Sequence, residues 1–181
     1  MSRIPALDPA AGQAADLLAA VAAKLGATPN LFKVAAHAPA ALEGLVALNG
    51  ALGAGALPAR TRESLAIAIA EVNGCDYCLS AHALIGKGAG LSETDIGLAR
   101  SGRAADGKAE AALAFARTVV ARRGKVSDAD LAAARIAGLS DGALVEVVAH
   151  VALNIFTNYL NNVAETEIDF PVLHTGTPRA A

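Results

Sequence analysis

Apolar side chains recur along most of the chain at intervals of three and four residues, the spacing that gathers them on one face of an α-helix. No stretch alternates apolar and polar residues over more than a few positions, and the sequence has no Gly-rich phosphate loop. We therefore predict an all-α fold. The predicted helices cover residues 9–25, 30–37, 39–52, 59–71, 76–87, 93–101, 105–122, 128–137 and 141–167.

The ends of several predicted helices carry residues that start or stop helices. Asp8 followed by Pro9 is typical of a helix start, with Asp as the cap and Pro in the first turn. Asn73 and Gly74 predict a stop, because both residues tolerate the left-handed backbone conformation that ends helices. The tail from Leu173 onward is expected to be ordered only where a partner holds it.

The composition narrows the class of protein. The chain has 181 residues, 54% of them hydrophobic but only 3% aromatic, so its core must consist of closely packed helices rich in small side chains. This length suits a single domain spanning residues 1–181. The net charge is -2 and no long basic run occurs, so nucleic acid is not an expected partner.

Two uncharged segments, residues 44–59 and 147–164, raise the question of a membrane. The first contains Asn49, four glycines and Pro58, and the second contains His150 and four asparagines, so neither predicts a membrane span. The N-terminus lacks an apolar core of signal-peptide length, and the expected location is the cytoplasm. A soluble chain this apolar is expected to hide part of its surface in a homo-oligomer.

Both cysteines of the chain lie at the predicted start of the helix over 76–87, within a core region of about 58–90. Cys75 and Cys78 are three residues apart, and Cys78 and His82 are four apart, so the three side chains share one helix face. A helix N-terminus lowers the pKa of a thiol. The arrangement can therefore generate a thiolate, let it attack, and close a disulfide.

Three interpretations of this cluster are open. The cysteines could simply pack in the core, or Cys75, Cys78, His82 and Glu63 could bind zinc. A structural zinc site usually has a second ligand pair, which this sequence lacks, so we predict no metal. The redox interpretation explains more: the thiolate attacks a peroxide, His82 takes the proton, and the second thiol captures the sulfenic acid. This chemistry needs no bound cofactor.

The spacing of four groups points to a family. Glu63, eleven residues, Cys75-x-x-Cys78, three residues and His82 together resemble the alkylhydroperoxidase D family of the carboxymuconolactone decarboxylase superfamily. Residues 29–33 and 154–171 are similar to the branch often called peroxidase-related proteins. The resemblance extends from about residue 29 to residue 171. It implies the all-α alkylhydroperoxidase D-like fold and an oligomer, a trimer or hexamer with a dimer as the minimum.

The resemblance also implies an activity and residue roles. The protein would be an antioxidant oxidoreductase, a thiol-dependent peroxidase of alkyl hydroperoxides or hydrogen peroxide, reduced by a thiol or a lipoyl-bearing protein. Cys78 would be the peroxidatic thiol and Cys75 the resolving one, joined in a redox-active disulfide. His82 would accept the proton and Glu63 would relay it through water. The best-studied members carry His before the second cysteine, where this chain has Tyr77, which can still donate a hydrogen bond.

Two other function classes remain from the sequence alone. One is a non-catalytic module that senses oxidants or binds metal through the same cysteines, and the other is a lactone decarboxylase-like enzyme of the same superfamily. The last predicted helix adds a polar stripe, which either pairs across a helix or subunit contact or places His150 or an asparagine beside the active pocket. The stripe consists of His150, Asn154, Thr157, Asn158 and Asn161.

Overall fold

The computed structural model describes residues 2–176, and within them the chain forms nine α-helices and no strand, which confirms the predicted all-α fold. Most helix bounds agree with the sequence prediction to within two residues. The helices are α1 (Gln13–Leu25), α2 (Asn30–Ala35), α3 (Pro39–Gly53), α4 (Ala59–Asn73), α5 (Asp76–Gly88), α6 (Glu93–Arg100), α7 (Gly107–Arg122), α8 (Asp128–Ile136) and α9 (Asp141–Ala164).

Helix α4 is the centre of the larger hydrophobic core. It packs against α5, α6, α7 and α9. Seven consecutive residues, from Ser64 to Ala70, are buried, so the helix is enclosed on all sides rather than on one face. Three of the seven are alanines, whose small side chains allow neighbouring helices to approach closely. This enclosure fixes the position of the turn that leads from α4 into α5.

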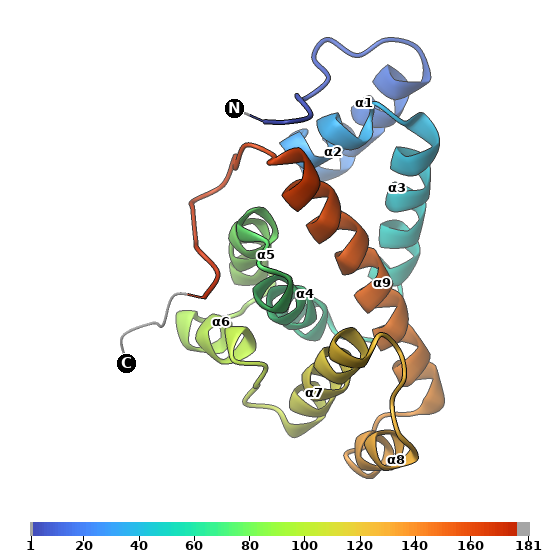
Figure 1. Cartoon of the computed structure of the whole chain (residues 1–181), viewed down its shortest axis with the longest axis vertical. Coiled ribbons are helices and arrows are strands. Elements are labelled where there is room, and N and C mark those ends of the chain that lie inside the picture. Colours follow the sequence, from blue (N-terminus) through green and yellow to red (C-terminus); the bar gives the residue numbers. More distant parts are fainter. Residues whose placement is uncertain (1, 177–181) are drawn as a thin grey trace.

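Helix α9 joins the larger core to a smaller one. The smaller core is formed by α1, α2 and α3, and Leu153 of α9 packs into it beside Leu42 and Leu45. Figure 1 shows α9 running between α3 on one side and α4 and α5 on the other. The inner face of α9 is partly polar, and it is turned toward the region where α4 meets α5.

One helix in the described part of the chain, α9, is long and apolar enough to cross a membrane by length and composition. In this fold it contacts α3, α4 and α7. Its buried residues include His150 and three asparagines. Here, α9 serves as a core helix.

Two predicted helix ends are wrong. The first helix begins at Gln13 rather than at Pro9, because the carboxylate of Asp8 pairs with Lys33 at 3.1 Å and does not cap a helix. The last helix ends at Ala164 rather than near residue 167, because Glu165 adopts a left-handed conformation with φ of 48°. A non-glycine residue favours this conformation too weakly to be predicted from its identity.

The prediction for the tail is also wrong for the residues that the structure describes. Leu173 and Thr175 are held by the chain's own α5. The Leu173 N–H donates to Ser80 Oγ at 2.9 Å, and the Thr175 N–H and hydroxyl both donate to Asp76 at 2.8 Å. Figure 1 shows this segment passing beside α5 and α6. The remainder of the predicted tail, residues 177–181, lies outside the described range.

Candidate active site

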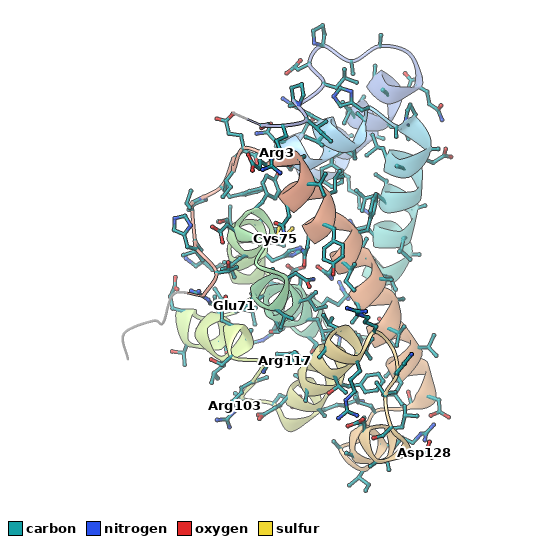
Figure 2. All side chains as sticks on the ribbon, viewed as in Figure 1. Arg3, Glu71, Cys75, Arg103, Arg117 and Asp128 are labelled. Carbon is teal, nitrogen blue, oxygen red and sulfur yellow. The ribbon has the colours of Figure 1, made fainter. Side chains whose placement is uncertain are left out.

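The start of α5 places both thiols where the sequence predicts them. Helix α4 ends at Asn73, and Gly74 turns the chain with φ of 63°, a left-handed conformation that glycine adopts without strain. Cys75 follows in an extended conformation as the N-cap of α5. Its sulfur accepts a hydrogen bond from the Cys78 N–H at 3.3 Å, in place of the usual oxygen cap. Figure 2 shows Cys75 at this junction, where α5 faces α9.

The two thiols have opposite electrostatic environments. Both are free cysteines and are almost completely enclosed, with Cys75 0% and Cys78 2% exposed. The hydrogen bond from the Cys75 thiol lowers the pKa of Cys78 to about 6 despite burial, assisted by the charge of His82 and the amides of Asn161 and Asn158. The same hydrogen bond, together with burial, raises the pKa of Cys75. Cys78 is therefore the thiolate of the pair and Cys75 its donor.

His82 and Glu63 form the second part of the site. His82 Nδ1 lies 2.8 Å from Glu63 Oε2, and the two side chains are 26% and 18% exposed. Because a carboxylate accepts, this contact places a proton on Nδ1 and leaves Nε2 to exchange protons. Burial opposes charge on His82, but the negative charges of Glu63 and Cys78 outweigh it and raise the His82 pKa. The proton released by Cys78 is thus stabilised on the imidazole.

Two asparagines of α9 border the thiolate. Asn161 Nδ2 donates to Cys78 Sγ at 3.2 Å, and both asparagines are buried. Asn158 Oδ1 accepts from Asn73 Nδ2 at 2.9 Å, which ties α9 to the turn between α4 and α5. The polar stripe was predicted either to pair across a helix contact or to border the active pocket. Asn161 borders the pocket, and Asn158 does both. Asn73 predicted only a helix stop from the sequence, and its role in orienting Asn158 depends on a tertiary contact.

Tyr77 is not directed at the thiols. Its hydroxyl accepts from the Leu31 N–H of α2 at 3.0 Å and hydrogen-bonds with Asp169, and its ring meets the edge of Phe170. Burial raises the pKa of the Tyr77 hydroxyl, which keeps it neutral. With its hydroxyl engaged in this way, Tyr77 links α5 to α2 and to the segment after α9.

His150 lies deeper on α9, beside the Glu63–His82 pair. It is 5% exposed, and its Nε2 is 4.0 Å from Glu146 Oε1 without a hydrogen bond. Burial lowers the His150 pKa, and the charges of Glu146, Glu63 and His82 also act on it. Glu146 was not singled out from the sequence. Its carboxylate accepts from the N–H groups of Ala56 and Leu57 and so holds the loop before α4.

The four candidate zinc ligands are arranged for proton transfer and not for binding a metal ion. They are Glu63, Cys75, Cys78 and His82. Among residues 2–176, no three His, Cys, Asp or Glu side chains are grouped so as to hold a metal ion. Glu63 binds His82 through Nδ1, and the neighbour of Cys78 across the site is the Asn161 amide, a hydrogen-bond donor. The absence of a metal from the purified protein stays a prediction.

Comparison with known families and structures agrees with the site geometry. The model of the Carboxymuconolactone decarboxylase family matches residues 39–121, a span that contains Glu63, Cys75, Cys78 and His82. No curated protein gave a match. The match to the family model supports the resemblance of the chain to the carboxymuconolactone decarboxylase superfamily. The alkylhydroperoxidase AhpD core of a solved structure with the same fold agrees with the branch that the sequence resembles.

Several solved structures share the fold over nearly the whole chain. A peroxidase-related protein from Ralstonia eutropha JMP134, with an alkylhydroperoxidase AhpD core, is 26% identical with a TM-score of 0.81, covering 93% of this chain and 92% of that one. A peroxidase-related protein from Silicibacter sp. TM1040 is 21% identical with a TM-score of 0.79, covering 97% and 94%. The debrominase Bmp8, in complex with 2,3,4-tribromopyrrole, is 19% identical with a TM-score of 0.76, covering 92% and 91%.

Proposed function

We propose that this protein is a thiol-dependent peroxidase that reduces hydrogen peroxide or alkyl hydroperoxides through a Cys75–Cys78 dithiol–disulfide cycle. The observation that carries the proposal is the pairing of a thiolate with a thiol: Cys78 has its pKa lowered to about 6, and the neutral Cys75 thiol is its hydrogen-bond donor. A nucleophile and its resolving group are thus in contact before any substrate binds.

The first step is attack of the Cys78 thiolate on the terminal oxygen of a hydroperoxide, R–O–OH. A sulfur–oxygen bond forms and the oxygen–oxygen bond breaks, which gives Cys78 sulfenic acid and an alkoxide. The alkoxide takes a proton from His82 and leaves as an alcohol, or as water when the substrate is hydrogen peroxide. Glu63 holds His82 in the orientation for this transfer at 2.8 Å and stabilises its positive charge.

The second step is resolution by Cys75. Its sulfur attacks the Cys78 sulfur, the Cys75–Cys78 disulfide forms, and hydroxide leaves and is protonated to water by the proton lost from Cys75. The high pKa of Cys75 delays its deprotonation until the negative charge on Cys78 has been consumed. An external dithiol, a small thiol or a protein-bound lipoyl group, then reduces the disulfide and is itself oxidised.

The test is peroxide consumption with dithiothreitol as the reductant, for the wild type and for Cys78→Ser and Cys75→Ser. We expect the wild type to turn over many times and Cys78→Ser to lose peroxide reduction. Cys75→Ser should still form sulfenic acid, which dimedone traps on Cys78 and mass spectrometry detects. Such trapping in Cys75→Ser but not in Cys78→Ser assigns the attacking sulfur.

Other outcomes would identify the other function classes. A single round of oxidation without turnover in excess dithiol would indicate a redox sensor. Wild-type protein whose thiols are not oxidised by either class of peroxide would exclude the peroxidase, and an unrelated activity that survives Cys78→Ser would point to the decarboxylase-like chemistry of the superfamily.

A further inference from the structure

Two buried polar atoms beside the thiolate have no hydrogen-bond partner within the described residues. They are the donor Asn158 Nδ2 and the acceptor Asn161 Oδ1. Asn158 is 0% exposed and Asn161 is 3% exposed, so both side chains are enclosed by the protein. Buried polar groups in folded proteins nearly always have a partner. An unpartnered donor and an unpartnered acceptor at a reactive sulfur therefore indicate that a ligand supplies the missing bonds.

Hydrogen bonds within the protein fix the orientation of both amides. Asn73 Nδ2 donates to Asn158 Oδ1 at 2.9 Å, which turns Asn158 Nδ2 to the opposite side of its amide. Asn73 is itself held, because Asn162 donates to its backbone carbonyl at 3.0 Å. Asn161 Nδ2 donates to Cys78 Sγ at 3.2 Å, so Asn161 Oδ1, on the same planar amide, also lies close to the sulfur.

Asn158 faces the same sulfur. Its amide acts on Cys78 as a weak hydrogen-bond donor and so helps to lower the Cys78 pKa, but the contact falls outside full hydrogen-bond geometry, and Nδ2 has a second N–H. The donor is therefore near Cys78 but not saturated by it. Asn158 and Asn161 are three residues apart on α9 and share the face turned toward Cys78.

We propose that Asn158 and Asn161 form the binding site for the hydroperoxide group itself, with Asn158 Nδ2 donating to one peroxide oxygen and Asn161 Oδ1 accepting from the peroxide O–H. This inference rests on the proposed function and names how that function recognises its substrate. A hydroperoxide carries one donor and several acceptors, which matches this donor–acceptor pair. Both contacts are made to the O–O–H atoms, so they are available to hydrogen peroxide and to alkyl hydroperoxides alike.

The two contacts also fit the reaction. Asn161 Oδ1 holds the oxygen that carries the hydrogen, which is the oxygen that Cys78 attacks. Asn158 Nδ2 donates to the other oxygen, which gains negative charge as the oxygen–oxygen bond breaks and then takes a proton from His82. A fixed donor aimed at developing charge lowers the barrier without reorganisation, and loss of such a donor typically slows a reaction about a hundredfold or more.

The experiment measures single-turnover oxidation of the reduced wild type, Asn158→Ala and Asn161→Ala by hydrogen peroxide and by tert-butyl hydroperoxide. In parallel, the rate of Cys78 alkylation by iodoacetamide reports thiolate reactivity without a peroxide. Both reactions are followed well above the Cys78 pKa of each variant, so that the sulfur is equally ionised. We expect Asn158→Ala to slow peroxide oxidation at least tenfold, by a similar factor for both peroxides, with little change in alkylation.

The control is Asn154→Ala, which removes a buried amide one turn away whose Nδ2 donates to the His150 carbonyl. We expect it to leave both rates near those of the wild type. If Asn158→Ala does not fold, Asn158→Asp replaces it, because the carboxylate keeps an acceptor for Asn73 and lacks the donor. Thermal unfolding of each variant shows which one is usable.

The outcomes separate this inference from the proposed function. A wild type that is alkylated normally but is not oxidised by either peroxide would reject the peroxidase. A wild type that is oxidised, with Asn158 and Asn161 variants oxidised at the same rate, would reject the binding site and leave the peroxidase standing. Equal loss of oxidation and alkylation would also reject it, since the asparagines would then act on the thiolate alone.

Discussion

Cys78 and His82 are best described as one unit that shares a proton. The Cys78 pKa is lowered to about 6 while the His82 pKa is raised, so the thiolate and the protonated imidazole favour each other. A cationic neighbour stabilises a thiolate, and a thiolate stabilises a protonated imidazole. Glu63 strengthens the second effect through its contact with Nδ1. The nucleophile and the acid for the leaving group are produced together.

The pH dependence of Cys78 alkylation by iodoacetamide tests this unit. For the wild type we expect a rate that is constant above neutrality and falls about tenfold per pH unit below about pH 6, because only the thiolate reacts. His82→Ala should move the midpoint upward, since the thiolate loses a positive neighbour. Glu63→Gln should move it in the same direction but less far, because the imidazole then holds its proton less firmly.

Cys78→Ser serves as the control that assigns the profile to Cys78, since it removes this thiol and should abolish the alkylation seen near neutral pH. A Glu63→Gln profile that overlays the wild type, with a shifted His82→Ala profile, would reduce the site to a Cys–His pair and remove Glu63 from the relay.

At this scale the sequence predicted some contacts and not others. Cys75, Cys78 and His82 share one helix, so their spacing alone predicted a common face, and the family pattern added Glu63. Asn158 and Asn161 could not be placed, because an asparagine on an inner helix face satisfies a neighbouring helix as readily as it borders a pocket. Whether these asparagines face the thiols depends on the rotation of α9 relative to α5, which is set by packing.

Among the elements, α5 is held at its first turn from three directions. Cys75 caps it, Tyr77 connects it to α2 and to Asp169, and Asp76 and Ser80 bind the segment after α9. The contacts of Asp76, Tyr77 and Ser80 lie on the side of α5 away from His82, so they position the thiols without contacting the reacting atoms.

Tyr77→Phe tests whether Tyr77 stabilises the position of α5 without affecting the reactivity of the thiols. The variant keeps the buried ring but removes a hydroxyl that accepts from Leu31 N–H and bonds to Asp169, so we expect a loss of about 1–2 kcal/mol in the free energy of unfolding. The iodoacetamide rate of Cys78 should remain that of the wild type. Urea unfolding and alkylation on the same samples provide both values.

The control is Thr118→Val, which removes an exposed hydroxyl that donates within its own helix and should change stability by less than about 0.5 kcal/mol. A Tyr77→Phe variant with normal stability but an altered rate of Cys78 alkylation would show that the tyrosine affects thiol reactivity directly.

The element bounds show where local signals suffice. The end of α4 at Gly74 was predicted because the effect of this residue is local, a left-handed turn. The start of α1 was predicted wrongly because Asp8 pairs with Lys33, a cation distant in sequence, and so does not cap the helix. The prediction for the tail was wrong for the same reason, because the residues of α5 that bind the tail are far away in sequence.

Considered as a whole, the molecule leaves an apolar stripe uncovered on the outer face of α9. The large exposed side chains of this stripe follow helical spacing along the helix and are Val145, Val148, Phe156, Tyr159 and Val163. No charged residue occurs between Glu146 and Glu165, so the outer face carries little to oppose association. An uncharged, apolar face can meet a second copy of itself about a two-fold axis without repulsion between like charges.

We expect the protein to be a homo-oligomer, at least a dimer, that uses this face of α9. Sedimentation of the wild type at micromolar concentration and ordinary salt should give a mass of two chains or more. The double variant Phe156→Glu with Val163→Glu should shift the protein to smaller species, because burying unpaired charges in an apolar contact is unfavourable. Ile136→Glu is the control: this residue of α8 is also exposed and apolar but lies off the stripe, so its mass should match the wild type. A monomeric wild type would show that the stripe does not mediate self-association, and an unchanged double variant would assign the contact to another face.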